Sequence, residues 1–188
     1  MRIDAKELPA LLRAIDRYQG THITRLAMKL MALTFVRTGE LIGARWTEID
    51  IESARWNIPL ERMKMRQPHI VPLSRQTLEV LESLRTLSGA REWLFPGGRK
   101  HRLAKVTSDH TKPINNNTIL GALKRMGYQG SMIGHRFRGL ASTILHEQGY
   151  NHEHIETQLA HTPPQRHVGR VQSRTVPGAQ GQNDTGLG

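Results

Sequence analysis

Apolar side chains recur every three or four residues along most of the chain up to Ala160, a spacing typical of amphipathic helices. The stretch 56–73 is different, because two short β-like runs, 56–60 and 69–73, flank a polar and basic segment. We expect helices over residues 4–18, 21–35, 38–46, 76–87, 116–126, 134–149 and 152–160. The pattern therefore predicts a mainly α domain of the α+β type with one small antiparallel sheet.

The helical pattern ends just after Thr162. Residues 163–188 contain almost no large apolar side chain, show no period, and are rich in glycine, glutamine and arginine. Such a segment cannot bury enough surface to offset the entropy lost on ordering, so we expect a disordered tail after a domain of residues 1–162. Residues 97–113, rich in arginine, lysine, histidine and glycine, are expected to form an exposed loop.

The charge of the chain points to a polyanionic partner. Its 27 lysines and arginines outnumber 16 acidic residues and leave a net charge of +11, which favours binding to nucleic acid. A ribosomal-type or merely basic surface is the alternative. An aromatic content of 5% argues against a single-stranded RNA binder, because such proteins stack bases on aromatic rings.

The absence of cysteine excludes a disulfide framework and a thiolate metal site, and it is compatible with a reducing cytoplasm. The first twelve residues contain no signal-peptide core, and no run approaches the ~18 apolar residues of a membrane span. We therefore expect a cytoplasmic protein with no membrane partner.

Two charged motifs stand out at helical spacing. Arg37 and Glu40 are three residues apart, which places a guanidinium and a carboxylate on one helix face; alone, this is an ordinary surface ion pair. His135 and Arg138 have the same spacing, with a capping histidine as the alternative for His135. The ten histidines form no spaced set with carboxylates, so we expect no metal site.

Taken in chain order, these motifs resemble the catalytic domain of tyrosine recombinases, in particular the integrases of prophages and genomic islands of the P4 phage type. The resemblance covers residues 4–161 and is carried by Arg37-x-x-Glu40-Leu41, Trp46, a basic hairpin ending in Val71-Pro72-Leu73, His135-x-x-Arg138 and Leu159-Ala160-His161. It implies a helical recombinase core that acts on double-stranded DNA in bacterial cytoplasm. The implied reaction is site-specific recombination, in which mobile DNA is integrated or excised through a 3′-phosphotyrosyl intermediate.

The resemblance also implies a role for each matched residue. Arg37 and Arg138 would clamp the scissile phosphate, since a planar, permanently charged guanidinium presents paired donors to phosphate oxygens. His135 and His161 would donate hydrogen bonds to the same phosphate and assist proton movement. For His161 the alternative is an interaction with the C-terminal dipole of the last helix. Glu40 would support an arginine or a histidine of the site.

The hairpin lysine of the family matches Lys64, which would protonate the departing 5′ hydroxyl as general acid. Arg62 and Arg66 are rivals for that position, because the register of the turn is open. The resemblance implies no metal or other cofactor, since the arginines would supply the electrostatic stabilisation that Mg²⁺ gives in other phosphoryl transfers.

Further basic residues are expected to contact DNA phosphates, which positions the protein without specifying a sequence. They are Arg45, Arg62, Arg66, Arg99, Lys100, Arg102 and Lys105. Family members form a tetramer on DNA and carry arm-binding and core-binding domains before this one; the chain begins close to where those domains would end. The family's last helix, which often packs onto a neighbouring protomer, is not found here, so we expect a monomer.

The family nucleophile is a tyrosine about ten residues beyond the last histidine, which corresponds to a position near Val171. The three tyrosines of this chain, Tyr18, Tyr128 and Tyr150, all precede His161. Two functions are therefore compatible with the sequence. The chain is either a recombinase that is defective because its nucleophile is absent, or a non-catalytic DNA-binding or regulatory module derived from an integrase.

The codons of the tail suggest a reason for the missing tyrosine. Moving the reading frame forward by one nucleotide turns the codons of Val171 and Gln172, GTN-CAR, into a codon TNC, which is tyrosine for one choice of N. The shifted frame permits Ala-Tyr-Asn-Arg-Ala-Gln-Tyr-Leu-Glu, which is similar to the nucleophile segment of these integrases. We therefore expect a frameshift between His161 and Gly169, of natural or cloning origin.

Overall fold

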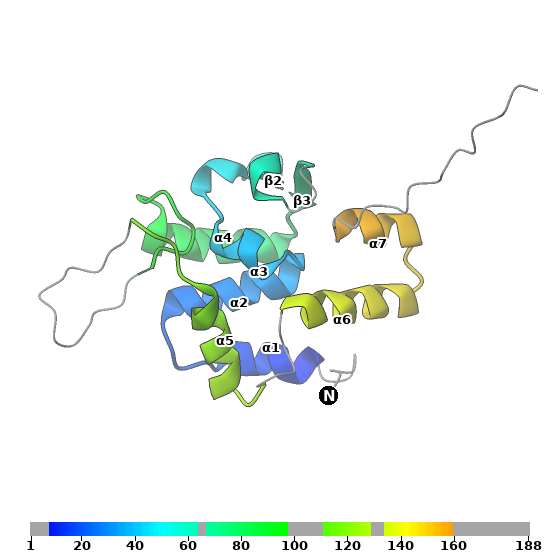
Figure 1. The fold of residues 1–188 in the computed structure, drawn as a ribbon, viewed down its shortest axis with the longest axis horizontal. Coiled ribbons are helices and arrows are strands. Elements are labelled where there is room, and N and C mark those ends of the chain that lie inside the picture. The colour runs from blue at the N-terminus through cyan, green and yellow to red at the C-terminus, as the bar shows by residue number, and fades with distance from the viewer. Residues whose placement is uncertain (1–7, 64–66, 98–110, 129–133, 160–188) are drawn as a thin grey trace, which may run out of the picture.

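The computed structural model describes residues 8–63, 67–97, 111–128 and 134–159. These residues form a mainly helical fold with a small antiparallel sheet, which confirms the predicted fold class (Figure 1). The α-helices are α1 (Leu8–Asp16), α2 (His22–Thr34), α3 (Thr38–Ile42), α4 (Arg75–Ser88), α5 (Asn116–Arg125), α6 (Gly134–Glu147) and α7 (His152–Gln158). Two short 3-10 helices span Trp46–Glu48 and Leu60–Arg62.

Helix α2 is the centre of the fold and packs against α1, α3, α4 and α5. It begins after Thr21, whose side chain accepts a hydrogen bond from the Thr24 N–H at 3.2 Å and so satisfies one of the free donors of the first turn. The helix ends at Thr34, within one residue of the predicted end. Its buried apolar face is formed by Ala27, Met28, Leu30 and Met31.

The sheet has three strands in the order β1-β2-β3, and both pairs are antiparallel. The strands are β1 (Ile49–Asp50), β2 (Arg55–Ile58) and β3 (His69–Pro72). The two predicted β-like runs are confirmed as β2 and β3, in which Trp56 and Val71 are paired and both fully buried. Strand β1 was not predicted, because two residues are too short to show an alternating pattern.

The predicted helix over residues 38–46 is wrong in its second half, since α3 ends at Ile42. Beyond Gly43 the chain turns away to meet residues that follow α4. Arg45 forms a β-bridge with Trp93, and the Trp46 N–H donates to the Glu92 carbonyl at 3.1 Å. Because these partners are distant in sequence, the spacing of apolar residues around Gly43 did not indicate that α3 ends at Ile42.

Helices α6 and α7 form a helical hairpin beside the main body (Figure 1). The turn between them contains Gly149 at φ +80, a conformation that favours glycine and is common just past a helix end. The Gly149 N–H donates to the His146 carbonyl at 3.0 Å, and the Tyr150 N–H donates to the Leu145 carbonyl at 3.1 Å. This pair of bonds is a Schellman motif, which satisfies carbonyls that the helix itself leaves open.

Nearly all the buried apolar residues of the described part of the chain belong to one of two clusters. The larger one is formed by α1 to α5 and the sheet, and the smaller one by Ala141, Ile155 and Leu159 of the α6–α7 hairpin. Phe35, the residue after α2, packs against both clusters. Its side chain is therefore part of the contact between the hairpin and the body.

Two predicted segments fall wholly or largely outside the described residues: the loop 97–113, from 98 to 110, and the tail 163–188. At the base of the loop, Pro96 and Pro113 form a β-bridge, and the Gly97 N–H donates to the Lys112 carbonyl at 2.7 Å. None of the helices in the described part of the chain has the length and apolar character that crossing a bilayer requires.

Candidate functional site

Arg37 is the N-cap residue of α3 and is held by Glu40 in the first turn of the same helix. The Arg37 N–H donates to Glu40 Oε2 at 2.9 Å, and Arg37 Nη1 donates to Glu40 Oε1 at 2.7 Å. The Glu40 side chain is 3% exposed, whereas that of Arg37 is 25% exposed. The predicted pairing is therefore present, and a quarter of the Arg37 side chain lies at the surface.

Arg138 lies on α6 and is almost fully buried, with 3% of the residue exposed. Its Nη1 donates to the Phe35 carbonyl at 2.9 Å, and its Nη2 is buried without a hydrogen-bond partner within the described part of the chain. Burial and, to a smaller extent, the nearby positive charge of Arg37 lower the pKa of Arg138 to about 10, while Glu40 and Glu156 act in the opposite direction. The group remains a cation at neutral pH.

The fold thus brings Arg37 and Arg138 close enough for their charges to repel one another. A buried guanidinium with an unpaired N–H group costs free energy, of the order of 1–3 kcal/mol for the unsatisfied donor alone. An anion bound beside the two cations would remove both costs, because it would accept a hydrogen bond from Nη2 of Arg138 and screen the repulsion. This pair is therefore the candidate anion site of the protein.

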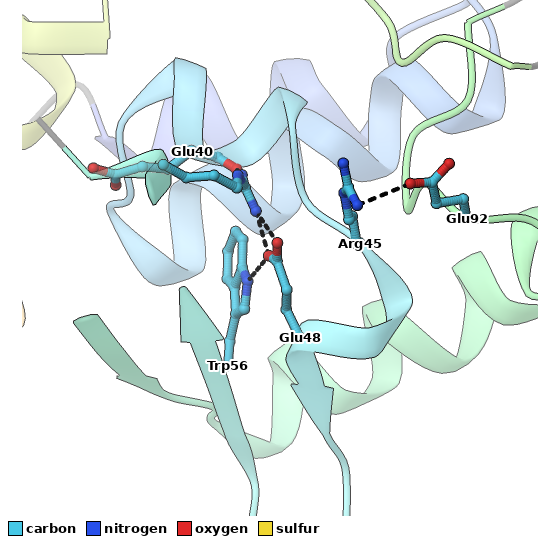
Figure 2. Close-up of polar contacts among 6 residues, drawn as sticks. Glu40, Arg45, Glu48, Trp56 and Glu92 are labelled. Carbon is cyan, nitrogen blue, oxygen red and sulfur yellow. Dashed lines mark hydrogen bonds and ion pairs between the residues drawn. The ribbon is translucent and has the colours of Figure 1, made fainter. Parts of the chain in front are cut away.

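A buried network lies beside the site and is shown in Figure 2. Glu48, in the 3-10 helix before β1, accepts a hydrogen bond from Trp56 Nε1 at 3.0 Å and pairs with Arg62 through both carboxylate oxygens. Arg62 also donates to the carbonyl of Glu40. One guanidinium therefore ties the connection after β2 to the helix that carries Arg37 and Glu40.

Arg62 stabilises the region around α3, because its guanidinium binds both Glu48 and the main chain of Glu40. Its side chain is 19% exposed, and its donors are engaged by Glu48 and by the main chain of α3. This arrangement does not test whether Arg62 contacts DNA. Nor does it test whether Arg62, in place of Lys64, is the general acid, so both stay predictions. Sequence reasoning missed Glu48 altogether, because its partner lies 14 residues further along the chain and no spacing marks the pair.

Arg45 is half exposed and is held at the surface by two contacts. Its Nη1 pairs with Glu92 at 3.0 Å, and its guanidinium lies 4.7 Å from the centre of the Trp93 ring (Figure 2 shows the ion pair). Both contacts hold the guanidinium in one place on the surface. Its predicted contact with a DNA phosphate stays a prediction.

Several predicted site residues cannot be placed. His135 lies in the first turn of α6, three positions before Arg138, and only its backbone is described. Those outside the described residues are Lys64, Arg66, Arg99, Lys100, Arg102, Lys105 and His161. Across the described ranges, no group of three or more histidine, aspartate or glutamate side chains is arranged to hold a metal ion.

The three tyrosines occupy structural or surface positions. Tyr18 is 7% exposed and accepts a hydrogen bond from Arg125 of α5, so it joins α1 to α5. Tyr128 packs against the main core, and Tyr150 is 58% exposed in the turn before α7. Two of the three are thus committed to packing within the main body.

Comparison with known proteins gives a consistent result. The sequence profile of the phage integrase family matches residues 1–167. The integrase of Enterobacteria phage P4 is 39% identical over 175 residues, which cover 85% of this chain and 38% of that protein. The chain spans about two fifths of the length of the curated relatives it matches.

Solved structures share the fold. The λ integrase catalytic core has a TM-score of 0.58 at 21% identity, over 85% of this chain and 94% of that one. The XerH site-specific recombinase, bound to its difH substrate in a pre-cleavage complex, has a TM-score of 0.62 at 16% identity, over 86% of this chain and 47% of that one. At these identities the likeness shows a common fold.

Proposed function

The chain belongs to the phage integrase family, the tyrosine recombinases, and on that basis we propose that residues 1–162 are the catalytic domain of a site-specific DNA recombinase. Its substrate is double-stranded DNA, and its reaction is the integration or excision of mobile DNA. The observation that carries the proposal is the pair Arg37 and Arg138, two cations brought together with a buried donor left open. A DNA phosphate is the anion that the family reaction would place there.

Each site residue then has a proposed part in the chemistry. Arg37 and Arg138 bind the non-bridging oxygens of the scissile phosphate and stabilise the negative charge that develops as it is attacked. His135 and His161 donate further hydrogen bonds to the same phosphate, and Lys64 gives a proton to the departing 5′ oxygen. Glu40 holds Arg37 in place through its two hydrogen bonds.

The nucleophile of the reaction is a tyrosine hydroxyl, which forms a bond to phosphorus while the 5′ oxygen leaves. No tyrosine follows His161 in this chain, so we propose that it binds DNA and does not cleave it. The proposed cause is a shift of reading frame between His161 and Gly169. The family profile matches the chain as far as residue 167 and no further, which supports a change of frame at that point.

Covalent capture on a nicked DNA substrate tests this proposal. The substrate spans the junction between the mobile element that encodes the chain and its host chromosome, with the nick placed so that cleavage traps the protein. The chain as it stands is expected to give no protein–DNA adduct, because it lacks a nucleophile. A gene with the frame restored is expected to give an adduct that is lost again when the new tyrosine is changed to phenylalanine.

Two outcomes would contradict the proposal. An adduct formed by the unaltered chain would mean that another residue acts as nucleophile. An encoding DNA with no tyrosine codon in the +1 frame near Val171 would exclude the frameshift.

A non-catalytic DNA-binding or regulatory module is the second candidate, favoured by the charge of +11 on a chain without a nucleophile. Both candidates predict a mobility shift that weakens steeply with salt, because each neutralised phosphate releases counterions. They differ in the frame-restored chain, which forms the adduct only if the domain retains a recombinase site. A monomer is expected in solution, and a stable tetramer in light scattering would contradict that expectation.

A further inference from the structure

Phe35 has an unusual backbone for an aromatic residue. Its φ and ψ are 55 and 20, in the left-handed region that residues other than glycine seldom adopt. Within the described residues, Ala54 at φ 50 is the one other non-glycine residue with a positive φ. Such a conformation persists only where the surrounding structure holds it, and it is frequent at functional sites.

The left-handed conformation has two visible consequences. The Phe35 N–H donates to the Met31 carbonyl at 3.0 Å and closes α2, while the Phe35 carbonyl turns out of the helix direction and accepts a hydrogen bond from Arg138 Nη1 at 2.9 Å. A Phe35 that continued α2 would direct its carbonyl along the helix axis, toward the next turn. The hydrogen bond to Arg138 therefore depends on the backbone at this residue.

That hydrogen bond determines the orientation of a planar group. Because the guanidinium is rigid, holding Nη1 at the Phe35 carbonyl also determines where Nη2 lies. Nη2 is the buried donor that has no partner within the described residues. Arg37 follows Phe35 by two positions, so the same turn also delivers the second cation of the site.

We propose that Phe35 is a positioning residue for the anion site, and that it acts through its left-handed backbone: the turned carbonyl holds one edge of Arg138 and leaves the other edge for the ligand. The inference rests on the proposed function of the arginine pair. The aromatic ring has a separate task, because it packs against both apolar clusters and contributes to stability.

The two tasks of Phe35 can be separated by two substitutions, one that keeps the left-handed backbone and loses the ring, and one that keeps an apolar side chain and loses the left-handed backbone. Phe35→Gly removes the ring and adopts the left-handed conformation without cost, while Phe35→Ile keeps an apolar side chain whose β-branch strongly disfavours that conformation. Packing alone therefore predicts that isoleucine preserves the site better than glycine. Positioning by the backbone predicts the opposite.

The first measurement is the ¹⁵N–¹H spectrum of the arginine guanidinium groups in the free protein. Arg138 is expected to give separate Nη1 and Nη2 signals in the unaltered chain, because the hydrogen bond to Phe35 slows rotation of the group. Phe35→Gly is expected to retain these signals, and Phe35→Ile to merge or shift them. Ala54→Val is the matched control, since it adds the same backbone strain away from Arg138 and is expected to leave the signals unchanged.

The second measurement is the affinity for a short double-stranded oligonucleotide in a mobility shift. Phe35→Ile is expected to weaken binding about tenfold, the loss of one charge-assisted contact, and to have a clearly smaller effect in a chain that already carries Arg138→Met, where only the position of Arg37 can still change. Phe35→Gly is expected to bind within about twofold of the unaltered chain. If Phe35→Ile does not fold, Phe35→Leu, with a smaller penalty for the left-handed conformation, replaces it.

The inference is overturned if Phe35→Ile keeps the Arg138 signals, or if Phe35→Gly loses them. Failure of the proposed function gives a different result. In that case Arg138→Met leaves DNA affinity unchanged, while the spectra of the free protein still report whether the backbone of Phe35 orients Arg138.

Discussion

Replacing Glu48 with alanine is expected to lower the free energy of unfolding by about 3 kcal/mol, because it removes one partner of a buried ion pair. The Glu48 side chain is 6% exposed and accepts hydrogen bonds from Arg62 and from the Trp56 indole. Without the carboxylate, the guanidinium and the indole N–H lose their acceptor inside the protein. Chemical denaturation in urea measures the loss as a shift of the midpoint at constant slope.

Glu92→Ala is the matched control for this prediction. Glu92 also pairs with an arginine, Arg45, but its side chain is 54% exposed, so its loss is expected to cost less than about 0.5 kcal/mol. Equal effects of the two substitutions would mean that the network around Glu48 contributes no more than a surface ion pair. Because Arg62 also holds the Glu40 carbonyl, Glu48→Ala is further expected to weaken DNA binding.

Replacing Arg138 with methionine is expected to raise the free energy of unfolding by about 1–2 kcal/mol and to weaken DNA binding about tenfold. The opposite signs arise because the same buried cation costs free energy in the free protein and, by the function we propose, binds a phosphate in the complex with DNA. Methionine keeps a flexible apolar side chain in the space and removes the charge, the repulsion with Arg37 and the open Nη2 donor. Urea denaturation and a mobility shift at one salt concentration measure the two effects.

The destabilisation caused by the Arg138 charge depends on pH in a defined direction. Since burial and Arg37 lower the pKa of Arg138 to about 10 in the folded chain, the cost of the charge is fully present below that pH and fades as the pH rises above it. Measurements at pH 7 therefore record the whole cost. Unfolding at pH 7 and pH 9 is expected to give the same difference between Arg138→Met and the unaltered chain.

Two further variants make the prediction specific. Arg138→Lys keeps the charge and loses the planar fork, so it is expected to weaken DNA binding without the gain in stability. Arg85→Met changes an exposed arginine of α4, and it is expected to alter stability by less than about 0.5 kcal/mol. A loss of stability in Arg138→Met would contradict the idea that the buried charge and the unpaired Nη2 of Arg138 lower the stability of the free protein.

Much of the fold could be predicted from the sequence because its signals are local. The spacing of apolar residues located the seven α-helices that the structure describes, within a few residues at most ends, but neither of the two 3-10 helices. The sequence also places a glycine, Gly149, just past α6, where φ is positive and a glycine is favoured. The ion pair of Arg37 and Glu40 was predicted from the three-residue spacing alone, because that spacing places both side chains on one helix face.

Other features could not be predicted because their causes are distant in sequence. The end of α3 at Ile42 depends on partners around Trp93, and strand β1 is too short to show a pattern. The burial of Glu48 depends on Arg62 and Trp56, which approach it only through the sheet and the turn that follows β2. None of these contacts leaves a regular spacing in the chain.

The sequence by itself therefore determined the fold class, the family resemblance and the absence of a tyrosine after His161, because these depend on residue types and their order along the chain. Only the tertiary structure decided how Arg138 is oriented. Its partner, the carbonyl of Phe35, lies 103 positions earlier, and it is available because a phenylalanine adopts a left-handed conformation that its residue type disfavours. Such a conformation is held by packing from several directions, and packing exists only after the chain has folded.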